Sequence, residues 1–317
     1  MRSGTLVRTA SPGRAAAKTT TLRARVWRER WMYLFMLPGL VFFLIFRYVP
    51  FLGNVIAFQD YSPFLGFDSP WVGLDNFAKL FSDPDVGTAI QNTLVISLLQ
   101  LIFFFPAPIA LALLLNSMIS ESAKRFMQSV LYLPHFISWV IIIALWQQLF
   151  GGAGLLNQFL RESGQATVNI MSNPGFFKFL VVLQLIWKET GWGTIIILAA
   201  LLQIEISLYE AASMDGASAW QRLWHITLPG IRGVIVLLLI LRLATTLNTG
   251  FEQMFLQRNA VGAQAAEVLD TFTYFRGIQG GDWGFSAAVG LVKGLVAAVL
   301  VFTANRVAKA MGEEGAF

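Results

Sequence analysis

The sequence predicts an all-α, polytopic membrane protein with six transmembrane helices, and two observations carry this prediction. Of the 317 residues, 56% are hydrophobic and only 13% are charged, whereas a soluble globular domain carries about 25% charged residues. The apolar residues also gather into six runs, each long enough to cross the roughly 30 Å hydrocarbon core of a bilayer as a helix. The mean hydropathy of +0.62 agrees with this composition.

The predicted spans cover residues 31–57, 88–117, 128–150, 176–203, 230–255 and 284–306. Pro106 and Pro108 lie in the second span and Pro134 lies in the third. Because proline lacks a backbone N–H, we expect a kink or a packed break at each of these positions. A further span inside 58–87 is excluded because that stretch is too polar.

We expect four regions along the chain. Residues 1–30 form a basic cytoplasmic tail, and residues 31–87 hold the first transmembrane helix and an outer loop. Residues 88–306 form a five-helix core that includes a loop at 204–229, and residues 307–317 form a C-terminal tail. The outer loop should contain an interfacial helix near Trp71–Asp83. Its apolar face would hold Leu74, Phe77, Leu80 and Phe81, with Asp75, Asn76 and Lys79 off that face.

The distribution of lysine and arginine predicts the orientation of these spans. With the N-terminus inside, the cytoplasmic stretches hold 14 lysines and arginines and the external stretches hold 4. Because cytoplasmic loops carry the excess of positive charge, both termini and the 204–229 loop should face the cytoplasm. The net charge of +5 thus reflects membrane topology and not nucleic-acid binding.

The 204–229 loop contains EAASMDGASAWQRLWHITLP, the longest polar stretch between two very apolar segments. Ser207 with Glu210, and Ser218 with Gln221, have the spacing of a capping box at a helix start. Gly216 lies between them, where a helix can end with a residue at positive φ. We therefore expect two short helices that meet at a glycine corner.

The same loop carries a spaced motif, EAA-x3-G-x9-I-x-LP. It is formed by Glu210, Ala211, Ala212, Gly216, Ile226, Leu228 and Pro229. This motif resembles the cytoplasmic signature of permease subunits of binding-protein-dependent ABC importers. Other stretches resemble the carbohydrate branch of that family, especially the aldouronate and lipoprotein-associated oligosaccharide permeases: 61–77, 92–99, 132–140, 187–201 and 250–253.

The resemblance implies that the loop docks into a groove on a separate ATP-hydrolysing subunit. Asp215 belongs to the same coupling segment, and Trp220, Leu223 and Trp224 form an apolar ridge at i, i+3 and i+4. Such a ridge should not face water, so it either docks on the ATPase or packs on the chain's own membrane helices.

The resemblance also implies the partners. These are a second permease subunit in a heterodimer, two ATP-binding subunits that hold ATP and Mg, and an extracytoplasmic solute-binding protein. The assembly would lie in the lipid of the bacterial cytoplasmic membrane and carry a sugar. The chain itself has no GxxxxGK[ST] phosphate loop, no cysteine and only two histidines. We therefore expect no catalytic residues, no metal site and no cofactor in this chain.

Four charged residues lie deep inside the predicted spans, where each is costly unless paired: Lys188, Glu189, Arg242 and Lys293. Counting about 1.5 Å per residue from the cytoplasmic ends places Glu189, Arg242 and Lys293 at nearly the same depth. Either Glu189 pairs with Arg242 or Lys293 to brace the helices, or these residues line the solute path. A surplus cation such as Lys293 would favour an acidic sugar such as a uronate. For His135, which follows Pro134, we expect a hydrogen bond to a carbonyl freed by the proline.

Sugars are bound by flat aromatic faces and by amides or carboxylates. Residues of these types near the same depth complete the predicted substrate path: Trp139, Gln147, Trp187, Trp192, Asn248 and Gln253. The alternative for the tryptophans is an anchoring role at the membrane interface. At the level of function, the alternatives are a permease for another solute, such as glycerol phosphate, and a self-sufficient secondary transporter. A secondary transporter would contain inverted repeats, and we find no internal repeat.

Overall fold

The computed structural model describes residues 27–313 and 315–317. The tail expected over residues 1–30 therefore lies almost entirely outside the described residues. The chain divides into two compact units, residues 1–53 and 54–317. Within the described ranges the only β pairing is an isolated bridge between Gln59 and Trp71. The prediction of an all-α fold is confirmed for this part of the chain.

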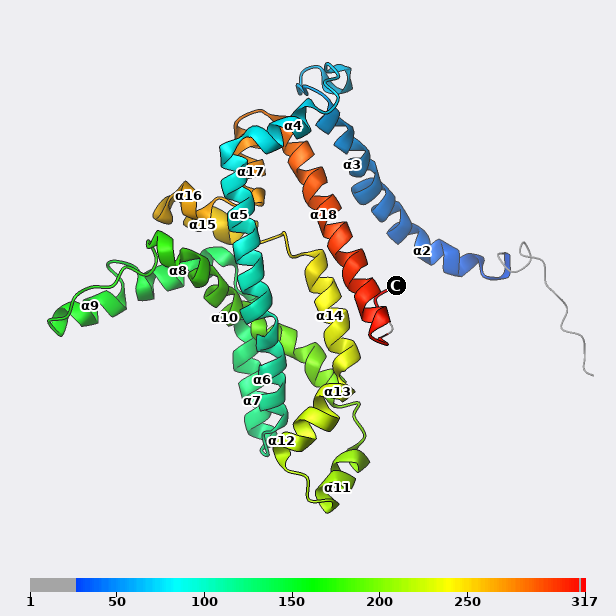
Figure 1. Ribbon diagram of the computed structural model, residues 1–317, viewed down its shortest axis with the longest axis vertical. Helices are drawn as coiled ribbons and strands as arrows, with labels where there is room; N and C mark the ends of the chain where they lie inside the picture. The colour runs from blue at the N-terminus through cyan, green and yellow to red at the C-terminus, as the bar shows by residue number, and fades with distance from the viewer. Residues whose placement is uncertain (1–26, 314) are drawn as a thin grey trace, which may run out of the picture. The chain divides into compact units, whose positions relative to one another are not determined.

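Figure 1 labels the α-helices, which follow one another with short connections. Their bounds are α2 Arg30–Phe43, α3 Val49–Leu52, α4 Asp75–Ser82, α5 Pro84–Leu99, α6 Pro106–Asn116, α7 Glu121–Tyr132, α8 Trp139–Phe150, α9 Leu155–Glu162, α10 Pro174–Leu201, α11 Ile206–Met214, α12 Ala219–Arg222, α13 Leu228–Gly230, α14 Arg232–Ala244, α15 Phe251–Val261, α16 Ala263–Ala266, α17 Leu269–Thr273 and α18 Trp283–Ala310. Short 3-10 helices occupy Gly53–Phe58, Gly66–Asp68 and Leu133–Phe136, and π-helical turns occupy Leu44–Tyr48, Gln100–Phe104, Leu223–Thr227 and Tyr274–Gln279.

Among the described residues, five helical stretches are long and apolar enough to cross a membrane. They are Arg30–Phe58, Pro84–Asn116, Trp139–Glu162, Pro174–Leu201 and Trp283–Ala310. A sixth results if Ala219–Gly230 and Arg232–Ala244, which meet at a 59° bend, count as one span. The predicted first, second, fourth and sixth spans match these stretches closely, whereas the third and fifth do not.

The helix α10 forms the centre of the 54–317 unit. Asn173 caps its start by accepting hydrogen bonds from the amides of Gly175 and Phe176, at 2.9 and 3.3 Å. Its 28 residues give a length of about 42 Å, enough to cross the bilayer. α10 packs against α5, α6, α7, α14, α15 and α16. The approach to α7 requires a glycine, because a Cβ on Gly191 would collide with the backbone of Leu131.

The buried core of this unit consists of three apolar clusters. One joins α5, α10 and α15–α17 around Phe177 and Met254. A second joins α4, α5, α17 and α18 around Phe272 and Phe285. The third joins α6, the end of α10 and the start of α14 around Ile197. α14 lies beside α18 (Figure 1).

The second span accommodates its prolines without a break. A π-helical turn over Gln100–Phe104 precedes Pro106, and the Phe105 amide donates to the Gln100 carbonyl at 3.0 Å. The wider turn gives the proline ring room. The Pro108 carbonyl accepts a hydrogen bond from the Thr194 hydroxyl of α10 at 3.3 Å.

The break expected at Pro134 is confirmed, but the bounds predicted for the third span, 128–150, are wrong. The helix ends at Tyr132, passes through a 3-10 turn and restarts at Trp139. Pro134 has no backbone N–H to donate in a helix. The Lys188 ammonium group of α10 instead donates hydrogen bonds to the carbonyls of His135 and Ile137, at 2.7 and 2.9 Å. The span that is long enough to cross the membrane is Trp139–Glu162.

The predicted fifth span over 230–255 is also interrupted. α14 ends at Ala244, where the hydroxyls of Thr245 and Thr246 both donate to the Arg242 carbonyl at 3.1 Å. Gly250 then adopts φ +98° immediately before α15. These features turn the chain inside an apolar stretch that hydropathy alone reads as continuous.

The helix expected in the outer loop forms as α4, but its packing differs from the prediction. Leu80 is buried in the core, whereas Leu74 and Phe81 are exposed. Asn76, predicted to lie off the apolar face, is buried and donates to the carbonyls of Ala57 and Gln59 at 3.0 and 2.9 Å. The helix is therefore held on the protein by a buried amide as well as by apolar contact.

The C-terminal residues fold back along α18, which continues to Ala310, beyond the predicted boundary at 306. The Asn305 side chain donates to the Phe317 carbonyl at 3.0 Å and accepts from the Ala316 amide at 2.7 Å. Glu313 forms an ion pair with Arg232 at 2.9 Å. The described residues after α18, 311–313 and 315–317, thus pack against α14 and α18.

Candidate functional site

The 204–229 loop forms two short helical segments that meet at Gly216. Gly216 has φ +77°. Its amide donates to the Ser213 carbonyl at 3.1 Å, and the Ala217 amide donates to the Ala212 carbonyl at 2.9 Å. This pair of bonds is a Schellman motif, which closes α11 at a position that favours glycine. The glycine corner is confirmed.

Only one of the two expected capping boxes forms. Ser218 and Gln221 exchange the two hydrogen bonds of a capping box, at 3.3 and 2.8 Å, and so begin α12. The box expected between Ser207 and Glu210 is wrong, because α11 starts at Ile206 and its N-cap is Glu205, two residues before Ser207. Across the corner, the Arg222 guanidinium donates to the Ser213 hydroxyl at 2.9 Å and links the two segments.

The apolar ridge of this loop is open on its aromatic side. Trp220 is 66% exposed and Trp224 is 53% exposed, and their rings contact each other with centroids 5.7 Å apart. Leu223, Ile226 and Leu228 are half-buried, and Glu210, Ala211, Asp215 and Pro229 are exposed, with Ala212 half-buried. The tryptophans therefore do not pack on the chain's own membrane helices.

A polar cavity lies beside α10, with a volume of about 330 Å³. Its walls come from the π-helical turn of the second span, from α8 and α10, and from the break between α14 and α15. The lining residues are Gln100, Phe104, Trp139, Leu185, Glu189, Trp192, Gly193, Arg242, Asn248, Thr249, Gly250 and Gln253. Broken helices thus bring backbone and side-chain polar groups into an otherwise apolar region.

This cavity contains most, but not all, of the side chains expected along the substrate path. Six line it: Trp139, Glu189, Trp192, Arg242, Asn248 and Gln253. Three do not. Gln147 is exposed on α8, Trp187 is 40% exposed and contacts Trp146, and Lys293 lies on α18. The first two positions share the residue types of the path but face away from it.

Sequence reasoning missed the other six lining residues: Gln100, Phe104, Leu185, Gly193, Thr249 and Gly250. Gln100 is the one amide within the apolar run LVISLLQLIFFF, and that isolation was a usable signal. Its carboxamide accepts from Arg242 at 2.6 Å. Thr249 and Gly250 line the cavity only because the fifth span breaks there, which the apolar pattern does not indicate.

The expected ion pair between Glu189 and Arg242 is not formed. Glu189 instead contacts the His135 ring nitrogen Nδ1 at 2.6 Å and the Lys188 ammonium group at 3.3 Å. The His135 ring also stacks on Trp192, with centroids 4.4 Å apart and an interplanar angle of 4°. The hydrogen bond expected from His135 to a freed carbonyl is likewise wrong, because Lys188 takes those carbonyls.

On the α15 side, Gln253 lines the cavity and belongs to a group of three buried glutamines. The Gln253 amide donates to the Val181 carbonyl at 2.9 Å and to the Gln184 side chain at 2.8 Å. Gln257 donates to the same Gln184 oxygen at 2.9 Å. Because each of these amides is bonded to a neighbour, Gln253 acts as a fixed part of the wall.

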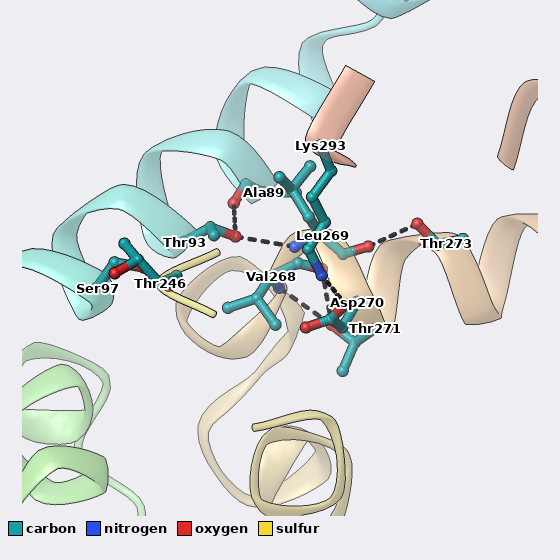
Figure 2. Close-up of polar contacts among 10 residues, drawn as sticks. All are labelled: Ala89, Thr93, Ser97, Thr246, Val268, Leu269, Asp270, Thr271, Thr273 and Lys293. Atoms are coloured by element: carbon teal, nitrogen blue, oxygen red, sulfur yellow. Dashed lines mark hydrogen bonds and ion pairs between the residues drawn. The ribbon is translucent and has the colours of Figure 1, made fainter. Parts of the chain in front are cut away.

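Lys293 has a different partner from those predicted. It forms an ion pair with Asp270 of α17 (Figure 2). In the same cluster, the Thr93 hydroxyl of α5 accepts from the Leu269 amide at 2.9 Å and donates to the Ala89 carbonyl at 2.7 Å. These contacts hold α17 between α5 and α18. Asp270 balances the positive charge of Lys293, and the pair lies outside the cavity.

A polar cavity bordered by interrupted helices in an otherwise apolar helical protein is the architecture of a membrane transport protein. The family model of the binding-protein-dependent transport system inner membrane component matches residues 104–312. The chain belongs to this family.

Several characterised proteins are similar over nearly their whole length. Protein LplB of Bacillus subtilis (strain 168) is 45% identical over 309 residues, 97% of each chain. The polygalacturonan/rhamnogalacturonan transport system permease protein YteP of the same organism is 46% identical over 302 residues, 95% of this chain and 94% of that protein. The sn-glycerol-3-phosphate transport system permease protein UgpA of Escherichia coli O6:K15:H31 is 34% identical over 282 residues, 88% and 93% of the two chains.

Solved structures agree with this assignment. A chain of a bacterial ABC transporter involved in the import of the acidic polysaccharide alginate is 36% identical, with a TM-score of 0.85 over 92% of this chain and 99% of that chain. A chain from the complex of such a transporter with an alginate pentasaccharide-bound periplasmic protein has a TM-score of 0.86 over 93% and 100%.

Proposed function

We propose that this chain is the permease subunit of an ABC importer and forms part of the translocation path for a sugar or oligosaccharide. The cavity beside α10 carries this proposal. Trp139 and Trp192 offer aromatic faces for the C–H surface of a sugar ring, and Glu189, Arg242 and Asn248 offer hydrogen bonds to its hydroxyls. The relatives support a saccharide over glycerol phosphate, because YteP is 46% identical and UgpA is 34% identical.

The proposal extends to coupling and orientation. The exposed ridge of Trp220 and Trp224 would dock into a groove on an ATP-binding subunit, two copies of which bind ATP and Mg. A second permease would supply the other half of the path, and an extracytoplasmic binding protein would deliver the solute. The excess of lysine and arginine supports a cytoplasmic location for both termini and for this loop. The assembly would lie in the bacterial cytoplasmic membrane.

Uptake by the reconstituted transporter tests the role of the cavity. We expect Trp192→Ala to lower oligosaccharide uptake by about tenfold or more, because losing the buried apolar contact of a large side chain costs about 1.5–3 kcal/mol. Trp187→Ala is the matched control, since Trp187 lies on the same helix but does not line the cavity. Equal uptake by the two variants, with normal complex yield for both, would rule the cavity out as the path.

A further inference from the structure

Arg242 brings a cation into the cavity without a carboxylate to balance it. Its guanidinium donates to the neutral Gln100 side chain at 2.6 Å and lies over the Phe104 ring, 5.0 Å from the centroid. Among the described residues, Arg242 takes part in no ion pair. A guanidinium group has five N–H donors, so most of its hydrogen-bonding capacity remains for a ligand.

The one carboxylate of the cavity already has a cation and an imidazole beside it. Glu189 lies 3.3 Å from the Lys188 ammonium group and 2.6 Å from His135 Nδ1. The charges of Lys188 and Glu189 offset each other, and Arg242 leaves one net positive charge at the cavity. The other deep cation, Lys293, is balanced by Asp270 outside the cavity.

Helix ends do not change this balance. The carbonyl end of α14 and the amide end of α15 both border the break at 245–250, so their opposite partial charges largely offset each other. Glu252 in the first turn of α15 is exposed and does not line the cavity. The unbalanced full charge of Arg242 therefore decides the sign of the site.

We propose that Arg242 selects an anionic saccharide by binding its carboxylate. This inference rests on the proposed function and names the solute class as a uronate-type sugar. The planar fork of arginine matches a carboxylate in two parallel hydrogen bonds, while Trp139 and Trp192 of the same cavity face the sugar ring. The binding of the solute would then supply the missing negative charge at a depth where an unpaired cation is costly.

Equilibrium binding to the purified permease–ATPase complex, without the binding protein, tests this directly. The probes are a galacturonate trisaccharide and the same trisaccharide with its carboxyl groups reduced to alcohols. We expect the wild-type complex to bind the acidic probe at least about tenfold more tightly, since a hydrogen bond to a charged group contributes about that factor. Arg242→Gln should bring the two affinities within about threefold, and Arg242→Lys, which keeps the charge but loses the planar fork, should keep a reduced preference.

Lys178→Gln is the matched control, because Lys178 is a cation of α10 that does not line this cavity. It should leave the preference unchanged. The inference would be overturned if the wild type bound both probes equally or bound neither of them. It would also be overturned if Arg242→Gln kept the preference of the wild type. Displacement of the acidic probe by sn-glycerol 3-phosphate at equal concentration would overturn it as well, since this would identify the anion as a phosphate.

Failure of this inference is distinguishable from failure of the proposed function. If the reconstituted transporter imports the neutral trisaccharide and Arg242→Gln imports it equally well, the chain is a saccharide permease without this selectivity. If neither saccharide is imported by a complex that hydrolyses ATP normally, the proposed function itself fails. If Arg242→Gln does not assemble, the comparison of the two probes in the wild type and in Arg242→Lys still decides.

Discussion

Lys188 shows how one buried charge can hold a broken helix. It is only 6% exposed, and its ammonium group bonds the carbonyls of His135 and Ile137 and pairs with Glu189. Its three N–H donors thus replace the helical donors that Pro134 and the turn after it do not supply. A lysine in this place stabilises the fold instead of contacting the solute.

We therefore expect Lys188→Met to lower the free energy of unfolding by about 3–5 kcal/mol, because it leaves a carboxylate and two carbonyls without their cation. The measurement is thermal or denaturant unfolding of the purified subunit in detergent. Lys178→Met is the control, since Lys178 lies on the same helix and makes no such contacts. The same loss of stability in both variants would contradict this role for Lys188.

At the residue scale, the sequence indicated which charges matter but not their partners. Glu189, Arg242 and Lys293 were found from their depth along the predicted spans. Depth does not define which way a side chain points around its helix. The partner His135 lies in a helix break, and Asp270 lies in a short helix between α15 and α18; the apolar pattern does not place either in space.

At the scale of elements, α10 and α18 could be predicted to within a few residues, because each is a long apolar run with clear ends. The third and fifth spans could not. Pro134 marks the first break in the sequence, but the break forms because Lys188 satisfies the carbonyls there. The second break at 245–250 depends on threonine hydroxyls and on Gly250, and such residues are common in continuous membrane helices as well.

The packing of α7 on α10 gives a prediction at this scale. Gly191→Ala should lower the free energy of unfolding by about 1–3 kcal/mol, because the added Cβ would overlap the Leu131 backbone, which can move only if α7 moves. Gly290→Ala of α18 is the control: its Cβ meets nothing within 4 Å, so the better helix propensity of alanine should leave stability equal or slightly higher. Unfolding midpoints in detergent decide, and a neutral Gly191→Ala would show that the two helices are not in tight contact.

At the scale of the whole molecule, the proposed transport function requires that the cavity respond to the 204–229 loop. Within residues 54–317, α11 and α12 lie at the end of the unit opposite α4 (Figure 1). The loop connects to the cavity through α14, which begins after the 59° bend at Ile231 and ends beside Arg242. A movement of the loop would therefore reach the cavity from both ends of the loop, through α14 and through α10, which ends at Leu201 and also lines the cavity.

The geometry of Gly216 allows this coupling to be tested. Gly216→Val places a β-branched residue at φ +77°, where the left-handed conformation costs a non-glycine residue about 1–2 kcal/mol. The strain should reorient α12 and its tryptophans and weaken ATPase binding by about five- to thirtyfold, while the subunit still inserts in the membrane.

Gly164→Val is the matched control. Gly164 has φ +70° and equally open surroundings, so the same strain is placed in the loop after α9. Copurification of ATPase, together with the stimulation of hydrolysis by solute-loaded binding protein, is the measurement. If both variants retain the wild-type amount of ATPase, the glycine corner is not part of the coupling interface; if both lose it equally, the loss reflects general instability.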